Sequence, residues 1–589
     1  MEVIFRDSSN LFICLLIFRF FNALLVQTSY VPDEYWQTIE VAHKWVFGYG
    51  SLTWEWQPRI ALRNPIHPLL ISLVYKMIAI LGVDSQWMIM KSPQILHGCF
   101  AAIADLHLYK LTYQLSGFEI AKWTLFHQVC NWFTIYCATR SLSNCIEWCL
   151  CIIGLYYYPW DAVCQTKQII QFPISSNYDQ SKWFIFIAVV CVLIRPTAFI
   201  IWFPLCLWHI WKNCIVNSLS VNNHRSLKEY QVYSRAKRFV GHFVYQIGIY
   251  LSIIVPCVVF SCILDRWTFN QWTVDQWNFI KFNFLFGGSG VYGVQPWHWY
   301  LSQGFTAMLL TQTPLVIIFI VMYFIFGPRL MRNLIIRKKT DYSKNSSNHL
   351  LSDPCGLCIV VIGWTVFWYS LLPHKEFRFI FPLIPLANYF AGIISVWFIR
   401  NGFRLHFPKS QHTRRQCLIW FIISTHIPLA LYVCLVHQRG GLDAIKFLNQ
   451  QMKNKLENEI AVVNLMPCHT VPSIGYLHRN ISFKQLSCDP DLTKLALGNY
   501  RHIDEADLFY ENPRLWLENY YLSLATEANS HFQKPRFVFM FDQLIITHKS
   551  VQSLLISWSY QLCGKLFFSH ILTHSQYGQS ILFYCLEYI

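Results

Sequence analysis

The sequence has few charged residues. Asp, Glu, Lys and Arg make up 13% of its 589 residues, whereas 54% are hydrophobic. This composition excludes an ordinary water-soluble globule and indicates a membrane protein with many spans. Acidic residues are the scarcer kind, 31 against 47 basic ones, for a net charge of +16. The basic residues lie in short segments between apolar runs, which is typical of membrane topology, so we expect no nucleic acid partner.

Several motifs of cofactor chemistry are also missing. The sequence contains no Walker loop, no GxGxxG after a predicted strand and no His/Cys cluster at metal-ligand spacing. It therefore predicts neither a metal site nor a bound cofactor.

Long apolar runs are abundant in the first 436 residues, and a run of about 20 such residues can cross a bilayer. We predict about eleven spans, the first of them retained because no cleavage site follows it. They are residues 11–29, 66–83, 94–114, 121–139, 144–160, 182–211, 240–264, 304–327, 356–373, 379–399 and 417–436.

The basic residues orient these spans. Dense groups of six, six and five Lys/Arg lie in the connections 212–238, 329–344 and 400–415, which the positive-inside rule places in the cytosol. Counting spans outward puts the first loop, 30–64, the turn 374–378 and everything after 437 on the opposite, lumenal face. The predicted fold is thus a polytopic α-helical membrane protein with a membrane domain at 1–436 and a C-terminal lumenal α/β domain at 437–589.

The tail 437–589 has runs too short to span a membrane. Strands are predicted at 461–466, 536–541, 565–572 and 580–586, with a helix at 550–562. Cys468 and Cys488 can pair in an oxidising compartment, although spacing alone leaves this open. Of two N-glycosylation sequons, we expect use of Asn480 and not of Asn345, which falls in a cytosolic connection.

The first loop opens with Pro32, Asp33 and Glu34, which predict the start of a helix. Tyr35, Ile39, Ala42 and Val46 form one apolar stripe, so we expect an amphipathic helix on the membrane surface. Trp36, Trp45, Tyr49, Trp54 and Trp56 are expected at headgroup depth. The two acids either complement the helix dipole or supply a general base, Asp33 before Glu34.

The turn 371–386, LLPHKEFRFIFPLIPL, places His374, Lys375 and Arg378 on the non-cytosolic side. Positive-inside bias cannot explain cations there, which leaves headgroup contact or the binding of an anionic phosphate. Glu376 is expected to hold the turn by pairing with a cation.

Other candidates lie elsewhere. The stretch 292–304 offers Trp297, His298 and Trp299, which suit either a sugar or the membrane interface. Asp105 and Arg195 fall inside predicted spans, where charge is costly, and we expect them to be structural partners.

Together, VPDEYWQTIEVAHKWVFGYGSLTWEW, RSLSN, RPTA, PWHWYLSQGF, HKEFRFIFPLIPL, HQRG, MPCHTVP and DEADLFYENP occur in one order over almost the whole chain. The chain resembles the dolichyl-phosphate-mannose-dependent α-mannosyltransferases of the GT-C fold, and within them the third-mannose branch of glycosylphosphatidylinositol (GPI) anchor synthesis. Gln295 stands where relatives often carry His, which leaves His298 as the better candidate in that stretch.

The resemblance implies an endoplasmic-reticulum enzyme that transfers mannose from dolichyl phosphate mannose to the 2-hydroxyl of the second mannose of a GPI precursor. It implies Asp33 as the base, and contact of the donor phosphate with His374, Lys375 and Arg378. Two alternatives remain open: a sister mannosyltransferase for lipid-linked N-glycan precursors, and a lipid-sugar transporter.

Overall fold

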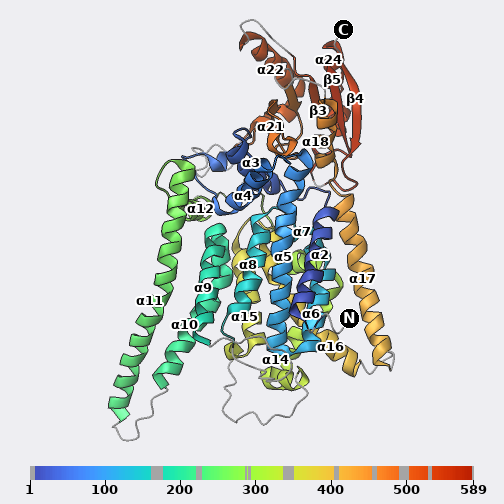
Figure 1. Ribbon diagram of the computed structural model, residues 1–589. Helices are drawn as coiled ribbons and strands as arrows, with labels where there is room; N and C mark the ends of the chain where they lie inside the picture. Colours follow the sequence, from blue (N-terminus) through green and yellow to red (C-terminus); the bar gives the residue numbers. More distant parts are fainter. Residues whose placement is uncertain are drawn as a thin grey trace.

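We describe a computed structural model of the chain, in which a bundle of long helices carries a domain of strands and helices at one end (Figure 1). We call that end the domain-bearing face. The structure describes residues 5, 7–160, 177–219, 228–285, 288, 293–335, 350–402, 410–453, 461–489, 503–527, 534–572 and 574–586. Asn345 lies outside these residues.

The bundle is made of helices that run along its length. Among the described residues, seven helical segments are long and apolar enough to cross a membrane, which confirms a multi-pass membrane protein. The bundle helices are α2 (Ser8–Leu25), α5 (Gln86–Ser116), α6 (Phe118–Cys130), α7 (Trp132–Cys137), α8 (Ser143–Tyr157), α9 (Asn177–Ile194), α10 (Phe199–Leu219), α11 (Lys228–Phe269), α13 (Phe305–Leu309), α14 (Thr313–Ile335), α15 (Pro354–Leu371), α16 (Ile384–Asn401) and α17 (Gln411–Leu435).

Two predicted spans are wrong. Residues 66–83 form the 15-residue helix α4 (Ile66–Ile80), whose Ile71, Tyr75 and Ile78 pack with residues of the C-terminal domain at the domain-bearing face (Figure 1). Residues 182–211 form two helices, α9 and α10, because Pro196 disfavours a helical conformation at Arg195 and a short 3₁₀ turn follows. Of these three helices, only the segment Pro196–Ile215, which contains most of α10, is among the seven candidate spans; α4 and the apolar part of α9, Lys182–Ile194, are shorter apolar helices.

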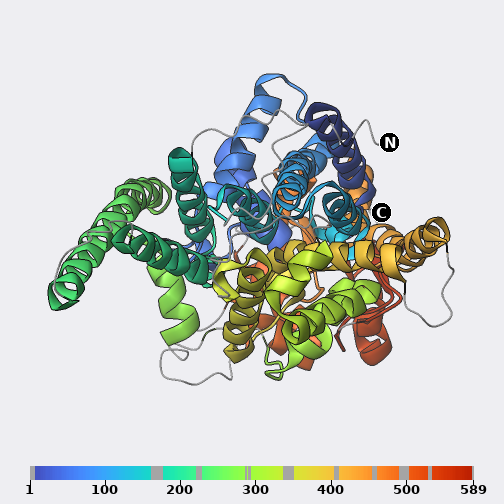
Figure 2. The ribbon, with the colours of Figure 1, turned by 90° about the horizontal axis from the view of Figure 1, so that it is seen from below.

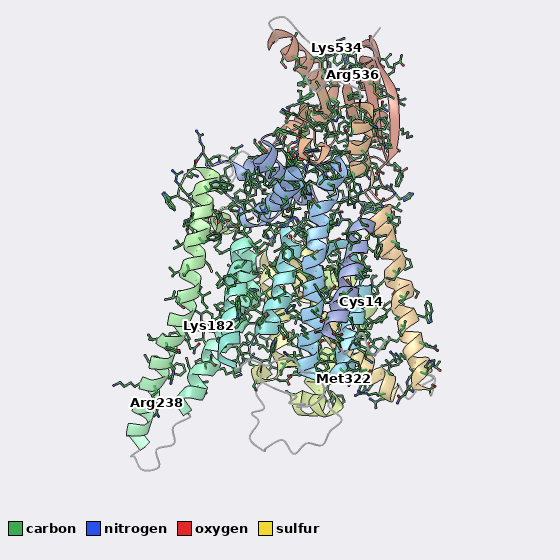
Figure 3. The ribbon with its side chains drawn as sticks, viewed as in Figure 1. Cys14, Lys182, Arg238, Met322, Lys534 and Arg536 are labelled. Atoms are coloured by element: carbon green, nitrogen blue, oxygen red, sulfur yellow. A yellow bond between two sulfur atoms is a disulfide. The ribbon has the colours of Figure 1, made fainter. Side chains whose placement is uncertain are left out.

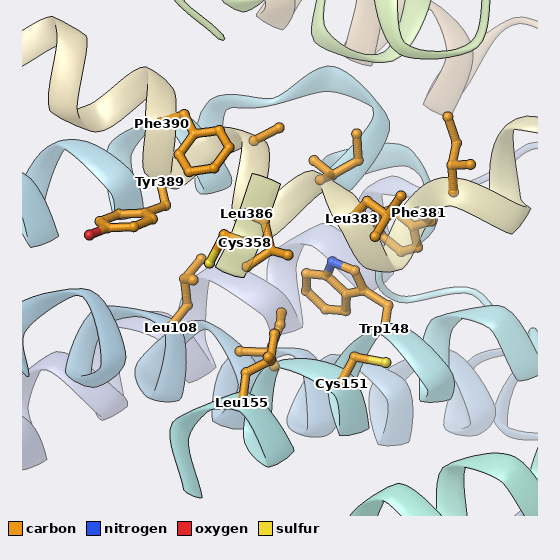
Figure 4. Close-up of a cluster of buried hydrophobic side chains, with 14 of the residues drawn as sticks. Leu108, Trp148, Cys151, Leu155, Cys358, Phe381, Leu383, Leu386, Tyr389 and Phe390 are labelled. Carbon is orange, nitrogen blue, oxygen red and sulfur yellow. The ribbon is translucent and has the colours of Figure 1, made fainter. Parts of the chain in front are cut away.

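The centre of the bundle fixes the position of the turn 374–378. Trp148 of α8 stacks on Phe381 of the 3₁₀ segment η9 (Phe377–Leu383), with ring centroids 5.0 Å apart (Figure 4). α16 continues from η9 and is almost wholly buried. By contrast, α10 and α11 stand at the edge of the bundle when it is seen from below (Figure 2).

A group of short helical segments lies at the domain-bearing face of the bundle (Figure 1). It contains the π-helical turn η1 (Tyr35–Ile39), α3 (Glu40–Phe47), the 3₁₀ turn η2 (Trp54–Trp56), α4, α12 (Asp275–Ile280) and the π-helical turn η4 (Lys281–Leu285). The expected surface helix is present, but its location is wrong. Tyr35, Ile39 and Ala42 pack against the C-terminal domain, and Trp36 is buried there instead of lying at headgroup depth.

The C-terminal domain contains a five-stranded mixed sheet in the order β2-β1-β3-β5-β4, with parallel pairs β1–β2 and β1–β3 and antiparallel pairs β3–β5 and β4–β5. The strands are β1 (Ala461–Asn464), β2 (Ser482–Gln485), β3 (Phe537–Phe541), β4 (Tyr560–Phe567) and β5 (Ser580–Leu586). The helices are α18 (Gly440–Gln451), α19 (Ile474–Leu477), α21 (Glu505–Glu511), α22 (Pro513–Glu527), α23 (Asp542–Thr547) and α24 (Lys549–Ser557). β4 starts five residues before its predicted start at 565, and β2 was not predicted.

The two parts of the chain are joined by buried polar contacts as well as apolar ones. The Glu40 carboxylate accepts hydrogen bonds from the backbone N–H groups of Ser473, Gly475 and Tyr476, at 3.2, 3.0 and 3.3 Å. A Cβ atom on Gly475 would lie 2.9 Å from the Glu40 carboxylate, so only glycine leaves room for this contact. The first loop is therefore docked onto the C-terminal domain through α3.

Candidate active site

The loop that carries Asp33 is tied down at its start. The backbone N–H groups of Gln27 and Ser29 donate to the carbonyls of Cys434 and Gln438, at 2.8 and 3.2 Å. The Thr28 hydroxyl donates to the carbonyl of Val433 at 2.6 Å. These bonds fix the exit of α2 against the end of α17. Asp33 then occupies the first turn of a helical segment, as Pro32 predicts.

The turn 374–378 meets Asp33 directly. Arg378 Nη1 lies 2.6 Å from Asp33 Oδ2, although the two residues are 345 positions apart in sequence. Arg378 also pairs with Glu376, the acid within the turn. Its Nε and Nη2 atoms lie 2.6 and 2.7 Å from the Glu376 carboxylate oxygens. His374 Nε2 contacts the same carboxylate at 2.8 Å. Glu376 thus holds two basic side chains of the turn, as its predicted structural role requires.

The charges in this cluster perturb one another. Burial acts to raise the pKa of Glu376, but Arg378 and His374 outweigh it and bring the pKa down to about 2. Arg378 lies between the Asp33 and Glu376 carboxylates, and these two anions offset the cost of burying its guanidinium group. Glu376 is therefore ionised at any pH at which the protein works.

Asp33 opens into a cavity whose empty space, open solvent at its mouth included, is about 780 Å³. Its Oδ1 atom has no hydrogen-bond partner among the described residues, and the side chain is 26% exposed. A carboxylate with one oxygen held and the other open can accept a proton from a bound hydroxyl. The polar and charged side chains that line the cavity are Asp33, Gln37, Arg63, Arg195, Thr197, Asn283, Tyr369, His374, Glu376 and Arg378.

Glu34 does not share this position and is not among the residues that line the cavity. Its side chain is fully buried and pairs with Arg140 Nη1 at 2.9 Å. Arg140 also donates to the Thr28 carbonyl and to the Tyr136 carbonyl, at 2.6 and 2.8 Å. Neighbouring residues of a helix point about 100° apart, so when Asp33 faces the cavity Glu34 faces the protein interior.

Several predicted binding residues lie outside the cavity. Lys375 turns away from it, because its ammonium group donates to the backbone carbonyls of Gln295 and Leu372. Trp297 is 68% exposed, and the exposed His298 contacts Ser302, which is also exposed. Trp299 is buried against Phe377, with ring centroids 4.9 Å apart. These four residues do not join Asp33 in the described structure.

The predicted pairing of Asp105 with Arg195 is also wrong. Asp105 pairs with Arg19 of α2 at 2.8 Å, and both side chains are fully buried. Arg195 pairs with Glu147 at 2.8 Å and donates from Nη1 to Ser143 and Asn144, both at 3.1 Å. Each of these charges inside the bundle does have a partner, as burial requires.

Two further arginines were missed by the sequence reasoning. Arg19 lies in the middle of a predicted span, and that position alone predicts an acidic partner, because an unpaired charge inside a membrane is costly. Arg63, from the first loop, lines the cavity and contacts Glu55 at 2.6 Å. Nothing in the local sequence distinguishes Arg63 from an ordinary loop residue.

The C-terminal domain contains the bridge between Cys468 and Cys488 that spacing alone left open, and a second one between Cys563 and Cys585. Asn480 is exposed, just before β2. Within the described residues, one group has metal-ligand proximity, formed by Cys468, His469 and Cys488. Its two sulfurs are joined to each other, so they do not supply the thiolates that a metal would need.

The architecture was compared with solved structures. Over 97% of both chains it is similar to the crystal structure of ArnT from Cupriavidus metallidurans bound to undecaprenyl phosphate, with a TM-score of 0.51 at 11% sequence identity. This likeness shows the fold, which is GT-C. The protein is thus a multi-pass membrane protein of this fold with a carboxylate that opens into a cavity.

The sequence comparisons are more specific. Residues 10–478 match the model of the Alg9-like mannosyltransferase family, and the chain belongs to that family. It is 34% identical to GPI alpha-1,2-mannosyltransferase 3 of Mus musculus, over 96% of this chain and 86% of the relative. It is 33% identical to the corresponding protein of Homo sapiens, over 94% and 83%, and 33% identical to Mannosyltransferase APTG1 of Arabidopsis thaliana, over 98% and 92%.

Proposed function

We propose that this mannosyltransferase uses dolichyl phosphate mannose as its donor and the 2-hydroxyl of the second mannose of a GPI precursor as its acceptor. The observation that carries the proposal is Asp33, whose open Oδ1 atom faces a cavity that three arginines also line. The names of the relatives support the acceptor, and the lipid phosphate bound to the structurally similar ArnT supports a lipid-linked donor.

The chemistry proceeds as one displacement with inversion at the anomeric carbon. Asp33 takes the proton of the acceptor hydroxyl as its oxygen bonds to the anomeric carbon. The bond from that carbon to the dolichyl phosphate oxygen breaks, and the electron pair goes to the phosphate. A β-linked donor thus gives an α1,2-linked product, and Asp33 later releases its proton to water.

Negative charge grows on the leaving phosphate during this step. Arg195 lines the cavity, and its Nη2 atom has no hydrogen bond or ion pair among the described residues, so that nitrogen can donate to a phosphate oxygen. Arg378 is held by Glu376 and reaches the same space. Guanidinium groups fixed in advance stabilise the charge of the transition state more than that of the ground state.

The site is proposed to face the lumen of the endoplasmic reticulum. Arg238 lies near the end of the bundle remote from the C-terminal domain (Figure 3), in one of the three basic connections. The positive-inside rule assigns that end to the cytosol, which leaves the domain-bearing face and Asp33 on the other side.

The test uses purified full-length protein with dolichyl phosphate mannose and a dimannosylated GPI precursor. The wild type should form the trimannosylated product, and Asp33→Asn should cut the rate by about 10²-fold or more, the scale of losing a general base. Asp443→Asn, in a surface ion pair with Arg439, is the matched control and should keep wild-type activity. Normal transfer by a folded Asp33→Asn protein would refute the assignment of the base.

The acceptor is tested by exchange. A lipid-linked N-glycan precursor replaces the GPI precursor in the same assay, and we expect no product from it. Elongation of the N-glycan precursor alone would refute the proposed acceptor while leaving the mannosyl transfer itself in place.

A further inference from the structure

The segment MPCHTVP brings one histidine of the C-terminal domain to the first loop. His469 lies in the loop after β1, next to the disulfide between Cys468 and Cys488. Its φ angle is +61°, in the left-handed region that residues other than glycine rarely adopt. Backbone strain of this kind persists where the surrounding structure enforces it, and it gathers at functional sites.

Three contacts enforce the orientation of the ring. His469 Nδ1 lies 3.2 Å from the sulfur of Cys468 and 3.5 Å from that of Cys488. The ring packs against Trp36, with centroids 4.7 Å apart. Trp36 is itself fixed, because its indole N–H donates to the Val471 carbonyl at 3.2 Å. The imidazole is therefore held on one edge and one face.

The other edge of the imidazole is open. No hydrogen bond to Nε2 is present among the described residues, and the residue is only partly buried. Trp36 follows Asp33 by three positions in one helical segment, so the ring that packs on Trp36 lies within about one turn of Asp33 along the chain. Burial lowers the pKa of His469, while Asp489 and Asp33 act to raise it, so the Asp33 carboxylate lies within electrostatic reach of the ring.

His469 is not among the residues that line the 780 Å³ cavity with Arg195, Arg378 and Asp33. It approaches the Asp33 segment from the C-terminal domain instead. A reaction at Asp33 needs two sugars, and the cavity with its arginines suits the one that carries phosphate. The side occupied by His469 is then left for the second, uncharged sugar.

We propose that His469 binds the acceptor sugar through Nε2, by a hydrogen bond to a hydroxyl next to the one that Asp33 deprotonates. A sugar hydroxyl can donate or accept, so it pairs with either neutral tautomer of the imidazole. This inference rests on the proposed function and gives the C-terminal domain a share in acceptor recognition.

The experiment measures KM for the GPI precursor and for dolichyl phosphate mannose separately. His469→Phe keeps the ring against Trp36 and removes Nε2, and it should raise the acceptor KM about tenfold while the donor KM stays within about twofold. His469→Gln, whose amide nitrogen reaches the place of Nε2, should recover most of the loss. His548→Gln is the control, because His548 precedes α24, which packs on the other face of the sheet.

Two results would overturn the inference: an unchanged acceptor KM in His469→Phe, or an equal rise of both KM values, which would indicate general damage. If the Phe variant does not fold, the wild-type protein still gives an answer. Modification of His469 by diethyl pyrocarbonate, followed by peptide mass spectrometry, should be slowed by the acceptor and not by the donor, and the reverse pattern refutes the contact. Absence of any mannose transfer by the wild type would instead refute the proposed function.

Discussion

Glu376 is the residue on which the geometry of the site can be tested most sharply. Its pKa falls from the usual 4.5 to about 2, which corresponds to about 3 kcal/mol of favourable interaction of the charged form. Its side chain is 21% exposed, so this value is an upper bound. Glu376→Gln removes the charge with almost no change of shape. We expect a clearly lower melting temperature and a large loss of mannose transfer.

The loss of transfer has a specific cause. Without Glu376, Arg378 keeps Asp33 as its remaining anionic partner, and the turn that presents His374 loses its anchor. The mutation should therefore lower kcat even at saturating acceptor. Thermal unfolding in detergent and a donor-dependent transfer assay measure the two effects on the same preparation.

The pH dependence follows from the direction of the shift. A carboxyl group with a lowered pKa stabilises the folded state fully above about 4.5 and loses that contribution as the pH falls towards about 2. The difference in melting temperature between wild type and Glu376→Gln should thus be constant from about pH 6 to 8. Glu518→Gln makes the same chemical change in an exposed pair with Arg514 and should cost less than about 1 kcal/mol. If Glu376→Gln has wild-type stability and wild-type transfer, Glu376 does not hold Arg378 and His374 in place as inferred.

Three further outcomes are expected. Glu34→Gln should destabilise the protein by about 3–5 kcal/mol by leaving Arg140 unpaired, yet the folded fraction should still transfer mannose, unlike Asp33→Asn; equal inactivity per folded molecule would contradict the structural role of Glu34. Arg19→Leu should be strongly destabilising, and adding Asp105→Leu should restore most of the melting temperature, whereas additive losses would argue against the buried pair. Asn480→Gln should remove one glycan, seen as a loss of endoglycosidase-sensitive mass, and an unglycosylated wild-type chain would argue against a lumenal domain-bearing face.

The members of the cluster around Arg378 could be predicted from local sequence, because a carboxylate directly after a membrane span and cations at a turn expected on the non-cytosolic side are unusual residues for those positions. Its geometry could not. Asp33 and Arg378 are 345 residues apart, and no local pattern states that they touch. The choice between Asp33 and Glu34 also depends on which side of one helical turn meets the cavity, and that is decided by Arg140, far along the chain.

The same reason explains the errors in the bundle. Two buried charges in apolar spans had to find partners, but sequence alone does not say which acid meets Arg195. The break between α9 and α10 could have been predicted from the sequence, since Arg195 precedes a proline. The position of α4 was not, because an apolar helix that packs under a domain has the same composition as one that crosses a membrane.

The bonds from the exit of α2 to the end of α17 have a consequence for biosynthesis. The loop that bears Asp33 leaves the ribosome near the beginning of translation, whereas the carbonyls of Val433, Cys434 and Gln438 that fix it arrive some four hundred residues later. Contacts so distant in sequence form only once the intervening chain is in place. A nascent or prematurely terminated polypeptide therefore carries its carboxylate unfixed, and activity begins only when the last helix of the bundle has been inserted.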